Sequence, residues 1–243
     1  MVEYLQSHYD RRHLRLFLVG YSAGSNLVHK IVRHLSHEQR LQESAVRAAM
    51  CVCVNSDYLR SRSRLESSWL GWVYSLLMCS LCKDILLRNA HVFEELDGLK
   101  DGDQAGHSVH SRASQLLAPC YLLSHYDAVA GRVFHGYQSE EHLNDCLSMA
   151  DFSSLGLPLL ALQPRDDPLH LGRVRENICP EQVAASPQVL YVESKYGNHF
   201  GFYEGGLLEA FQSRSSYTYP ARLAAEFFEV VLEEEEAEQA SQR

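Results

Sequence analysis

One five-residue motif constrains the fold of this chain more than any other feature. Gly20-Tyr21-Ser22-Ala23-Gly24 reads G-x-S-x-G. It follows a short apolar run rich in strand formers, Leu14 to Val19, and it precedes Asn26 to Leu35, where apolar residues recur at helical spacing. The sequence therefore predicts a strand, a sharp turn and a helix in immediate succession.

A serine at such a turn is typical of a nucleophile elbow, which holds the hydroxyl above the edge of a sheet near the positive end of the following helix. The tightness of the turn predicts that Gly20 and Gly24 must both be small residues. A glycine-rich turn without chemistry is the alternative interpretation. We expect the nucleophile, Ser22.

Three further runs are strand candidates, and the first of them is a continuous apolar run of the kind found in strands covered on both faces of a parallel sheet. They are Val46 to Val54, Pro158 to Leu162 and Gln188 to Glu193. Helical patterns are predicted from Leu65 to about Leu99 and from Ala221 to Leu232, with a possible helix end at Met1 to Tyr9, while the polar stretch His107 to Ser114 is expected to be a loop. Strands alternating with helices predict an α/β fold with a mainly parallel sheet.

A serine hydroxyl needs a base, and in elbow-bearing sheets the acid and the histidine follow the serine along the chain. Asp167 follows the third strand pattern and His199 follows the fourth, so both are expected at the same carboxyl edge as Ser22. Asp166, its neighbour, and Asp57, after the second strand pattern, stay open as alternative acids. We predict the triad Ser22, Asp167 and His199.

The net charge argues against nucleic-acid binding, and the cysteines indicate the redox compartment and argue against a metal site. The net charge is −9, and part of it lies in an acidic run from Glu233 to Glu238, so the electrostatic signature of nucleic-acid binding is missing. Seven cysteines without a disulfide-like framework indicate a reducing compartment. Cys79 and Cys82 form a lone C-x-x-C inside an apolar segment, which favours packing over metal binding. We expect a cytoplasmic or membrane-associated intracellular protein.

The longest apolar stretch runs from Trp69 to Leu87. Ser75, Ser80, Lys83 and Asp84 interrupt it, so it falls short of the roughly 18 clean apolar residues that a membrane span needs. A buried or lipid-facing helix is the better interpretation, and peripheral membrane contact follows as an expectation.

Taken together, these segments resemble the YheT-like α/β hydrolases, also called embryogenesis-associated or ABHD-type esterases and lipases. The likeness extends over nearly the whole chain. It rests on the elbow Phe17 to Asn26, Leu65-Glu66 with Tyr74 and the leucine-rich helix, Gly136 to Ser139, Leu157 to Leu160 with Asp166 to Pro168, and Tyr196 to Phe202 with Glu204-Gly205. The chain departs from the family pattern at Ala23, where leucine is common, and at Asn198, where glycine is usual.

The resemblance implies an α/β-hydrolase domain over residues 1–232, with a helical lid-like region at about 60–150 and an acidic tail at 233–243. It implies hydrolysis of acyl-lipid or short-chain carboxylic esters, with no metal or organic cofactor. The backbone N–H of Ala23 would be one donor of the oxyanion hole.

Family members have several strands before the elbow, whereas nineteen residues precede Gly20 here. We therefore expect an N-terminally truncated sheet without the loop that supplies the second oxyanion donor, and loss of one such donor typically slows the reaction about 100- to 1,000-fold. The alternative function is a catalytically impaired hydrolase remnant that binds a lipid or a protein.

Overall fold

The computed structural model describes residues 14–41, 43–93, 109–149, 152, 155–170, 183–199, 202 and 219–241. The chain divides into two compact units: unit 1 is residues 1–56, 147–167 and 172–243, and unit 2 is residues 57–146 and 168–171. The lid-like region predicted at about 60–150 stays a prediction. The assignment of residues 1–232 to a single domain stays a prediction.

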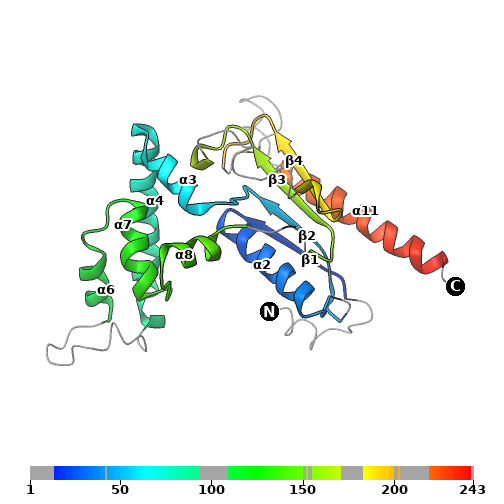
Figure 1. Ribbon diagram of the computed structural model, residues 1–243, viewed down its shortest axis with the longest axis horizontal. Coiled ribbons are helices and arrows are strands. Elements are labelled where there is room, and N and C mark those ends of the chain that lie inside the picture. The colour runs from blue at the N-terminus through cyan, green and yellow to red at the C-terminus, as the bar shows by residue number, and fades with distance from the viewer. Residues whose placement is uncertain are drawn as a thin grey trace. The chain divides into compact units, whose positions relative to one another are not determined.

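Unit 1 is built on a parallel sheet of four strands in the order β1-β2-β3-β4 (Figure 1). The strands are β1 (Leu16–Tyr21), β2 (Val46–Val52), β3 (Leu159–Pro164) and β4 (Val189–Ser194). Each overlaps one of the predicted apolar runs, and the mainly parallel sheet is confirmed. Every residue of β3 is buried, as expected for an inner strand covered on both faces.

Helices cover both faces of this sheet. Helix α2 (Ala23–His37) follows the elbow, and its buried Val28 and Val32 pack with one set of alternate strand residues, which includes Cys51 and Ala161. Helix α11 (Tyr219–Ser241) packs with the other set, which includes Met50. Since successive strand residues point to opposite faces, the two helices lie on opposite sides of the sheet.

The register brings the strand ends to one edge. Tyr21 pairs with Val52, and Val52 pairs with Leu162. Pro164 pairs with Ser194 at the end of β4. Residues that directly follow these four strands are therefore neighbours at the carboxyl edge of the sheet, where parallel α/β folds gather their functional side chains.

The acidic C-terminal run is helical in the structure. The predicted helix at Ala221 to Leu232 continues as α11 through Ser241. Glu235, inside the run, faces Arg15 and Arg47, with carboxylate oxygens 3.3 Å and 3.2 Å from the respective Nε atoms. These ion pairs join the far end of α11 to the residues before β1 and at the start of β2.

Unit 2 is helical throughout its described residues. Its elements are α3 (Tyr58–Glu66), α4 (Trp69–Arg88), η1 (Ala90–Phe93), α6 (Val109–Leu117), α7 (Leu123–Tyr126), η2 (Asp127–Gly131), α8 (Glu140–Leu147) and η3 (Pro168–His170). The loop expected at His107 to Ser114 is wrong from Val109 onward, because Ala113 and Leu117 lie one helical turn apart and pack into an apolar cluster with α4 and η2. The predicted helix end at Met1 to Tyr9 lies outside the described residues.

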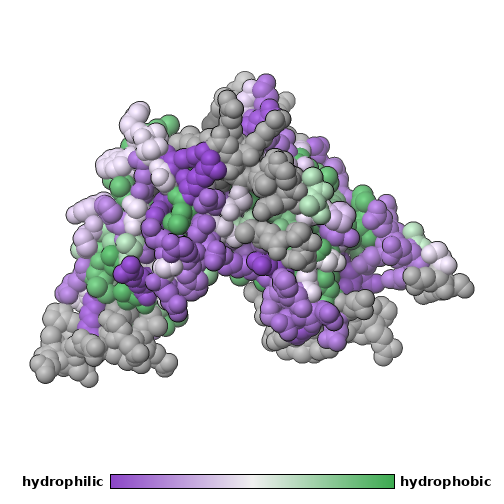
Figure 2. Space-filling view, in the orientation of Figure 1, coloured by the Kyte–Doolittle hydropathy of each residue, from purple (hydrophilic) through white to green (hydrophobic). Residues whose placement is uncertain are grey.

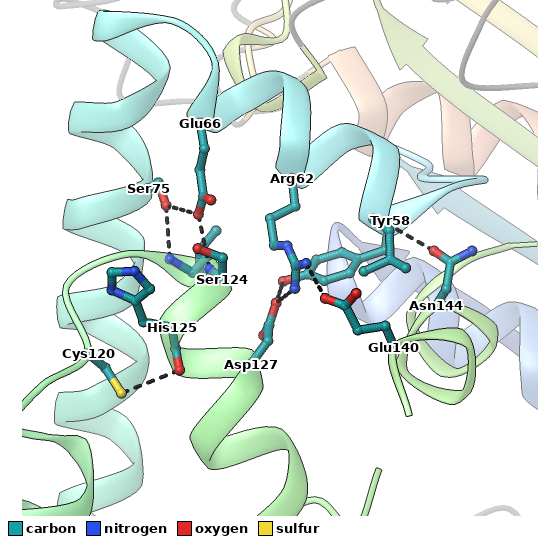
Figure 3. Close-up of polar contacts among 12 residues, drawn as sticks. Tyr58, Arg62, Glu66, Ser75, Cys120, Ser124, His125, Asp127, Glu140 and Asn144 are labelled. Atoms are coloured by element: carbon teal, nitrogen blue, oxygen red, sulfur yellow. Dashed lines mark hydrogen bonds and ion pairs between the residues drawn. The ribbon is translucent and has the colours of Figure 1, made fainter. Parts of the chain in front are cut away.

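A buried polar network crosses the interior of unit 2 (Figure 3). The Asp127 carboxylate accepts hydrogen bonds of 2.8 Å from the Tyr58 hydroxyl and from Arg62, whose second nitrogen lies 2.9 Å from Glu140. Burial raises the pKa of Asp127, while the bonds from Arg62 and Tyr58 act in the opposite direction. Asp127 is the first residue of the π-helical turn η2, so the network joins that turn to α3 and α8.

Helix α4 leaves much of its apolar surface exposed, and Figure 2 shows apolar residues on the outside of the unit 2 helices. Its exposed apolar residues are Trp69, Leu70, Trp72, Leu77, Leu81 and Ile85. Among the described residues α4 alone is long and apolar enough to span a membrane by length and composition, with a mean hydropathy of 1.5 over its best window. The expectation that this stretch falls short of a span is therefore not met. Cys79 is buried in the apolar cluster of unit 2, as the packing interpretation predicts.

Candidate active site

The turn after β1 has the conformation of an elbow. Ser22 has φ 52° and ψ −121°, a left-handed φ that is uncommon for any residue other than glycine. Its N–H donates to Val52 O on β2 at 2.9 Å, and its carbonyl accepts from Ser25 N at 2.9 Å as α2 begins. Strained non-glycine backbone of this kind is concentrated at functional sites.

The two glycines of the motif differ in what they require. A Cβ on Gly20 would lie 2.3 Å from Gly24 O and 2.7 Å from Ser25 N, both of them backbone atoms that have no room to move aside. A Cβ on Gly24 would meet nothing within 4 Å. The prediction of a small residue is therefore confirmed at Gly20, where the backbone of α2 makes the close approach. At Gly24 a Cβ has room, and the exclusion of larger side chains there stays a prediction.

Ser25 fixes the elbow from inside, a role that the sequence interpretation missed. Its hydroxyl is fully buried and lies 2.8 Å from Gly20 O and 2.7 Å from Val52 O. One side chain thus joins the strand before the turn, the helix after it and the neighbouring strand. A serine three residues after Ser22 was a visible signal, but its partners become apparent only in the folded chain.

Asp167 and His199 are brought together across the carboxyl ends of β3 and β4. The Asp167 Oδ2 lies 2.8 Å from the His199 Nδ1, and both side chains are almost completely buried. An imidazole whose Nδ1 faces a buried carboxylate is held in one orientation and is stabilised when it becomes charged. These two residues therefore have the geometry of an acid and base pair.

The alternative acids have other partners. Asp166 points to the backbone of the histidine loop, where its Oδ1 accepts from Asn198 N at 2.8 Å. Asn198 has φ 50°, and its own side chain accepts from His199 N at 2.6 Å. Asp57 caps helix α3 by accepting from Arg60 N at 3.0 Å.

Cys53, which the sequence interpretation missed as a site residue, lies beside this pair. It directly follows β2, has φ 57°, and its Sγ is 3.1 Å from His199 O. The Sγ, a ligand oxygen of Asp167 and a ring nitrogen of His199 all lie within 4.8 Å of one another. Burial, and after it the neighbouring Asp167 carboxylate, raises the pKa of the Cys53 thiol well above its ordinary value.

Cys53 also connects the elbow to the pair, because it is next in the chain to Val52, which accepts the Ser22 N–H. Ser22, Asp167 and His199 thus all leave strand ends at one edge of the sheet. The hydrogen bond between the Ser22 hydroxyl and the His199 imidazole stays a prediction. Ala23 is the first residue of α2, so its N–H is among those that a helix leaves without an intrahelical partner, and its role in an oxyanion hole is likewise a prediction.

The parallel sheet, its flanking helices and the elbow after β1 define the class: the chain has the α/β-hydrolase fold. Comparison with known sequences shows which proteins the chain is similar to. The chain is 28% identical over 210 residues to "Abhydrolase domain-containing protein 2" of Drosophila melanogaster, covering 86% of this chain and 49% of that protein. It is 28% identical over 222 residues to "Monoacylglycerol lipase ABHD2" of Homo sapiens, covering 86% of this chain and 47% of that one.

The chain is therefore similar to ABHD2-type α/β-hydrolase domain proteins over most of its length. It spans about half the length of the curated relatives that it matches. No protein-family model matches it. Among solved structures, MGS-M2, an α/β-hydrolase enzyme from a Medee basin deep-sea metagenome library, is 12% identical with a TM-score of 0.41, covering 95% of this chain and 69% of that one.

Proposed function

We propose that this chain carries the catalytic residues of a serine carboxylic ester hydrolase. Ser22 Oγ attacks the acyl carbonyl carbon, and His199 accepts the hydroxyl proton and passes it to the leaving alkoxide. Water then attacks the acyl-enzyme with His199 again as base, while Asp167 holds the imidazole. The Ala23 N–H donates to the tetrahedral oxyanion.

One observation supports this proposal above the others: the buried 2.8 Å pair of Asp167 and His199 lies at the same sheet edge as the strained Ser22. A buried carboxylate without a partner would be costly, and a histidine is an effective partner because it shares the charge. An interior ion pair of purely structural value has no reason to be located at the strand ends that adjoin an elbow.

Labelling by a fluorophosphonate tests the nucleophile directly. We expect the purified, folded chain to react covalently. We expect the reaction to disappear in Ser22→Ala, because among the described serines Ser22 alone has a positive φ at a strand-to-helix turn. Ser63→Ala, an exposed serine on α3, is the matched control and should label like the parent chain. Labelling that persists in Ser22→Ala would reject Ser22 as the nucleophile.

The substrate class follows from the relatives. Several of them are named monoacylglycerol lipases, and we propose monoacyl lipid esters or shorter acyl esters as substrates of this chain. Hydrolysis of a series of p-nitrophenyl esters and of a monoacylglycerol would rank acyl lengths. A chain that labels at Ser22 but releases acid from none of these esters would contradict the substrate proposal and leave the nucleophile intact.

Peripheral membrane contact is the second part of the proposal. Helix α4 exposes Trp69, Trp72 and Leu77, and Trp side chains at one end of an apolar helix suit the boundary between lipid headgroups and acyl chains. We expect co-sedimentation with phosphatidylcholine vesicles that weakens in Leu77→Glu. Equal sedimentation of both proteins would refute a role for α4. Leu59→Glu on α3 is unsuitable as a control, because Leu59 is partly buried and the change would perturb packing.

The competing function is a binding module that has lost catalysis. It would follow if the oxyanion hole had a single donor, since loss of one donor typically slows ester hydrolysis about 100- to 1,000-fold. A folded chain that fails to label with fluorophosphonate yet binds vesicles would favour this alternative. Labelling at Ser22 together with ester turnover favours hydrolysis.

A further inference from the structure

Three metal-ligand side chains of different chemistry meet at the carboxyl edge of the sheet. They are the thiol of Cys53, the carboxylate of Asp167 and the imidazole of His199, and one ligand atom of each lies within 4.8 Å of the others. All three residues are buried, with exposed fractions of 1%, 3% and 4%. They follow β2, β3 and β4 respectively, so three adjacent strands hold them.

We propose that Cys53, Asp167 and His199 form an inhibitory site for a thiophilic divalent cation of the Zn²⁺ class. Sulfur, imidazole nitrogen and carboxylate oxygen are the three ligand types that Zn²⁺ uses in proteins. A cysteine excludes the hard cations Mg²⁺ and Ca²⁺ as good occupants, since they prefer oxygen ligands. Three protein ligands leave a fourth position for water, as in open zinc sites.

The spacing fits a tetrahedral ion after a small movement. Zinc bonds of about 2.0 to 2.3 Å place tetrahedral ligand atoms about 3.3 to 3.7 Å apart. The Asp167 and His199 atoms are now 2.8 Å apart, so that they must separate by roughly half an ångström. Neither the strand ends nor the sheet has to move for a change of this size, because side-chain torsions are enough.

Metal binding at this site changes the protonation of the imidazole. In the metal-free site the ring proton is on Nδ1, and this N–H donates a hydrogen bond to Asp167. In the metal-bound site the Nδ1 lone pair binds the cation, and the ring proton lies on Nε2. Cys53 releases its thiol proton to solvent, so one proton leaves the protein for each ion bound. An Nε2 that carries a proton has no lone pair for the Ser22 proton, and therefore the bound ion blocks the proposed base.

The inhibitory half of this inference rests on the proposed function, whereas the binding half does not. Cys53 has an ordinary packing explanation, because a buried thiol serves as a small apolar group and its Sγ already contacts His199 O. What packing does not explain is the location of the thiol within ligand distance of a carboxylate and an imidazole at once. The experiment has to separate these two explanations.

Co²⁺ added to the full chain after treatment with a chelator is the direct probe, since its visible spectrum reports thiolate ligation and tetrahedral geometry. We expect one Co²⁺ per chain, a thiolate-to-cobalt charge-transfer band and displacement by Zn²⁺. Cys53→Ser should lose the band and bind at least tenfold more weakly. Cys51→Ser is the matched control and should keep the band, because Cys51 is a buried cysteine within β2 that packs in the cluster with α2 rather than in the cluster of Cys53.

A band that persists in Cys53→Ser, or its absence from a folded parent chain, would overturn the proposed site. If Cys53→Ser does not fold, Cys53→Ala provides the same test, together with the melting temperature, which Zn²⁺ should raise in the parent chain only. Should the chain have no esterase activity, the cobalt spectrum still decides the site. Should it be active, Zn²⁺ must inhibit the parent chain and spare Cys53→Ser, and equal inhibition of both would reject the inhibitory role.

Discussion

Replacement of Gly20 by alanine tests the elbow more sharply than removal of the serine does, because the structure predicts opposite results for the two glycines of the motif. In Gly20→Ala the new methyl would overlap three backbone atoms of α2 at 2.3 to 2.7 Å, so the strand and the helix must separate by about an ångström. Overpacking of a rigid interior typically costs 1 to 3 kcal/mol, and we expect about 3 kcal/mol here because backbone cannot change rotamer.

Gly24→Ala is the matched control, with the same added methyl four residues away. It meets no atom within 4 Å and lies in the first turn of α2, where alanine is the better helix former by up to about 1 kcal/mol. Urea denaturation of both variants measures the difference, and fluorophosphonate labelling shows whether Ser22 keeps its environment. Equal stability of the two variants would refute the close approach at Gly20 and the elbow geometry derived from it.

Three further outcomes follow from buried polar groups. Asp127→Asn should lower the free energy of unfolding, measured by urea denaturation, by about 3 kcal/mol, because Arg62 loses its buried carboxylate partner while Tyr58 keeps an acceptor. An unchanged free energy would show that the ion pair of Arg62 and Asp127 is dispensable. Gln163→Met should raise stability by about 1 kcal/mol, because neither amide atom of the buried Gln163 has a hydrogen-bond partner among the described residues; a loss would reveal a hidden partner. Burial raises the pKa of Cys51 from 9.0 to about 12. Between pH 9 and 12 the unfolded chain loses this proton while the folded chain keeps it, so the free energy of unfolding falls as pH rises. Cys51→Ala should make this pH dependence shallower in denaturation experiments, and an unchanged pH dependence would assign it to other groups.

The strand positions could be predicted because their signals are local. Runs of five to nine residues that end in polar turns identify all four described strands, and the G-x-S-x-G motif correctly predicts the first turn and helix. Helix α6 shows where such signals fail. Its sequence has few apolar residues, and Ala113 and Leu117 become core residues only through their packing with α4 and η2.

The candidate site divides in the same way. Asp167 and His199 were predictable because each follows a strand pattern, and the carboxyl ends of parallel strands share an edge. Cys53 also follows a strand, but a cysteine in an apolar run reads as core, so its sequence context conceals it. The side chains of Ser25 and Asp166 form hydrogen bonds with backbone atoms. A sequence pattern does not predict which backbone carbonyl or N–H group such a side chain will contact.

Strained backbone at the sheet edge unites the elbow, the thiol and the histidine loop. Four non-glycine residues in the described part of the chain have positive φ: Ser22, Cys53, Asn198 and Gln39. Gln39 belongs to the turn after α2, and the other three all follow strands at the carboxyl edge. Each such conformation costs of order 1 to 3 kcal/mol. Residues with strained backbone would be spread over the molecule if they arose by chance, whereas they gather in one place at a functional site.

The hydrogen bonds show how the fold holds these conformations in place. The N–H of Ser22 donates to a carbonyl of β2, and the N–H of Cys53 donates to a carbonyl of β3. The N–H of Asn198 donates to the carboxylate of Asp166, just beyond β3. The first two strained residues are therefore held by the neighbouring strand, and the third is held by a carboxylate just beyond β3. These bonds fix the backbone beside Ser22 and His199, which is what the proposed nucleophile and base require.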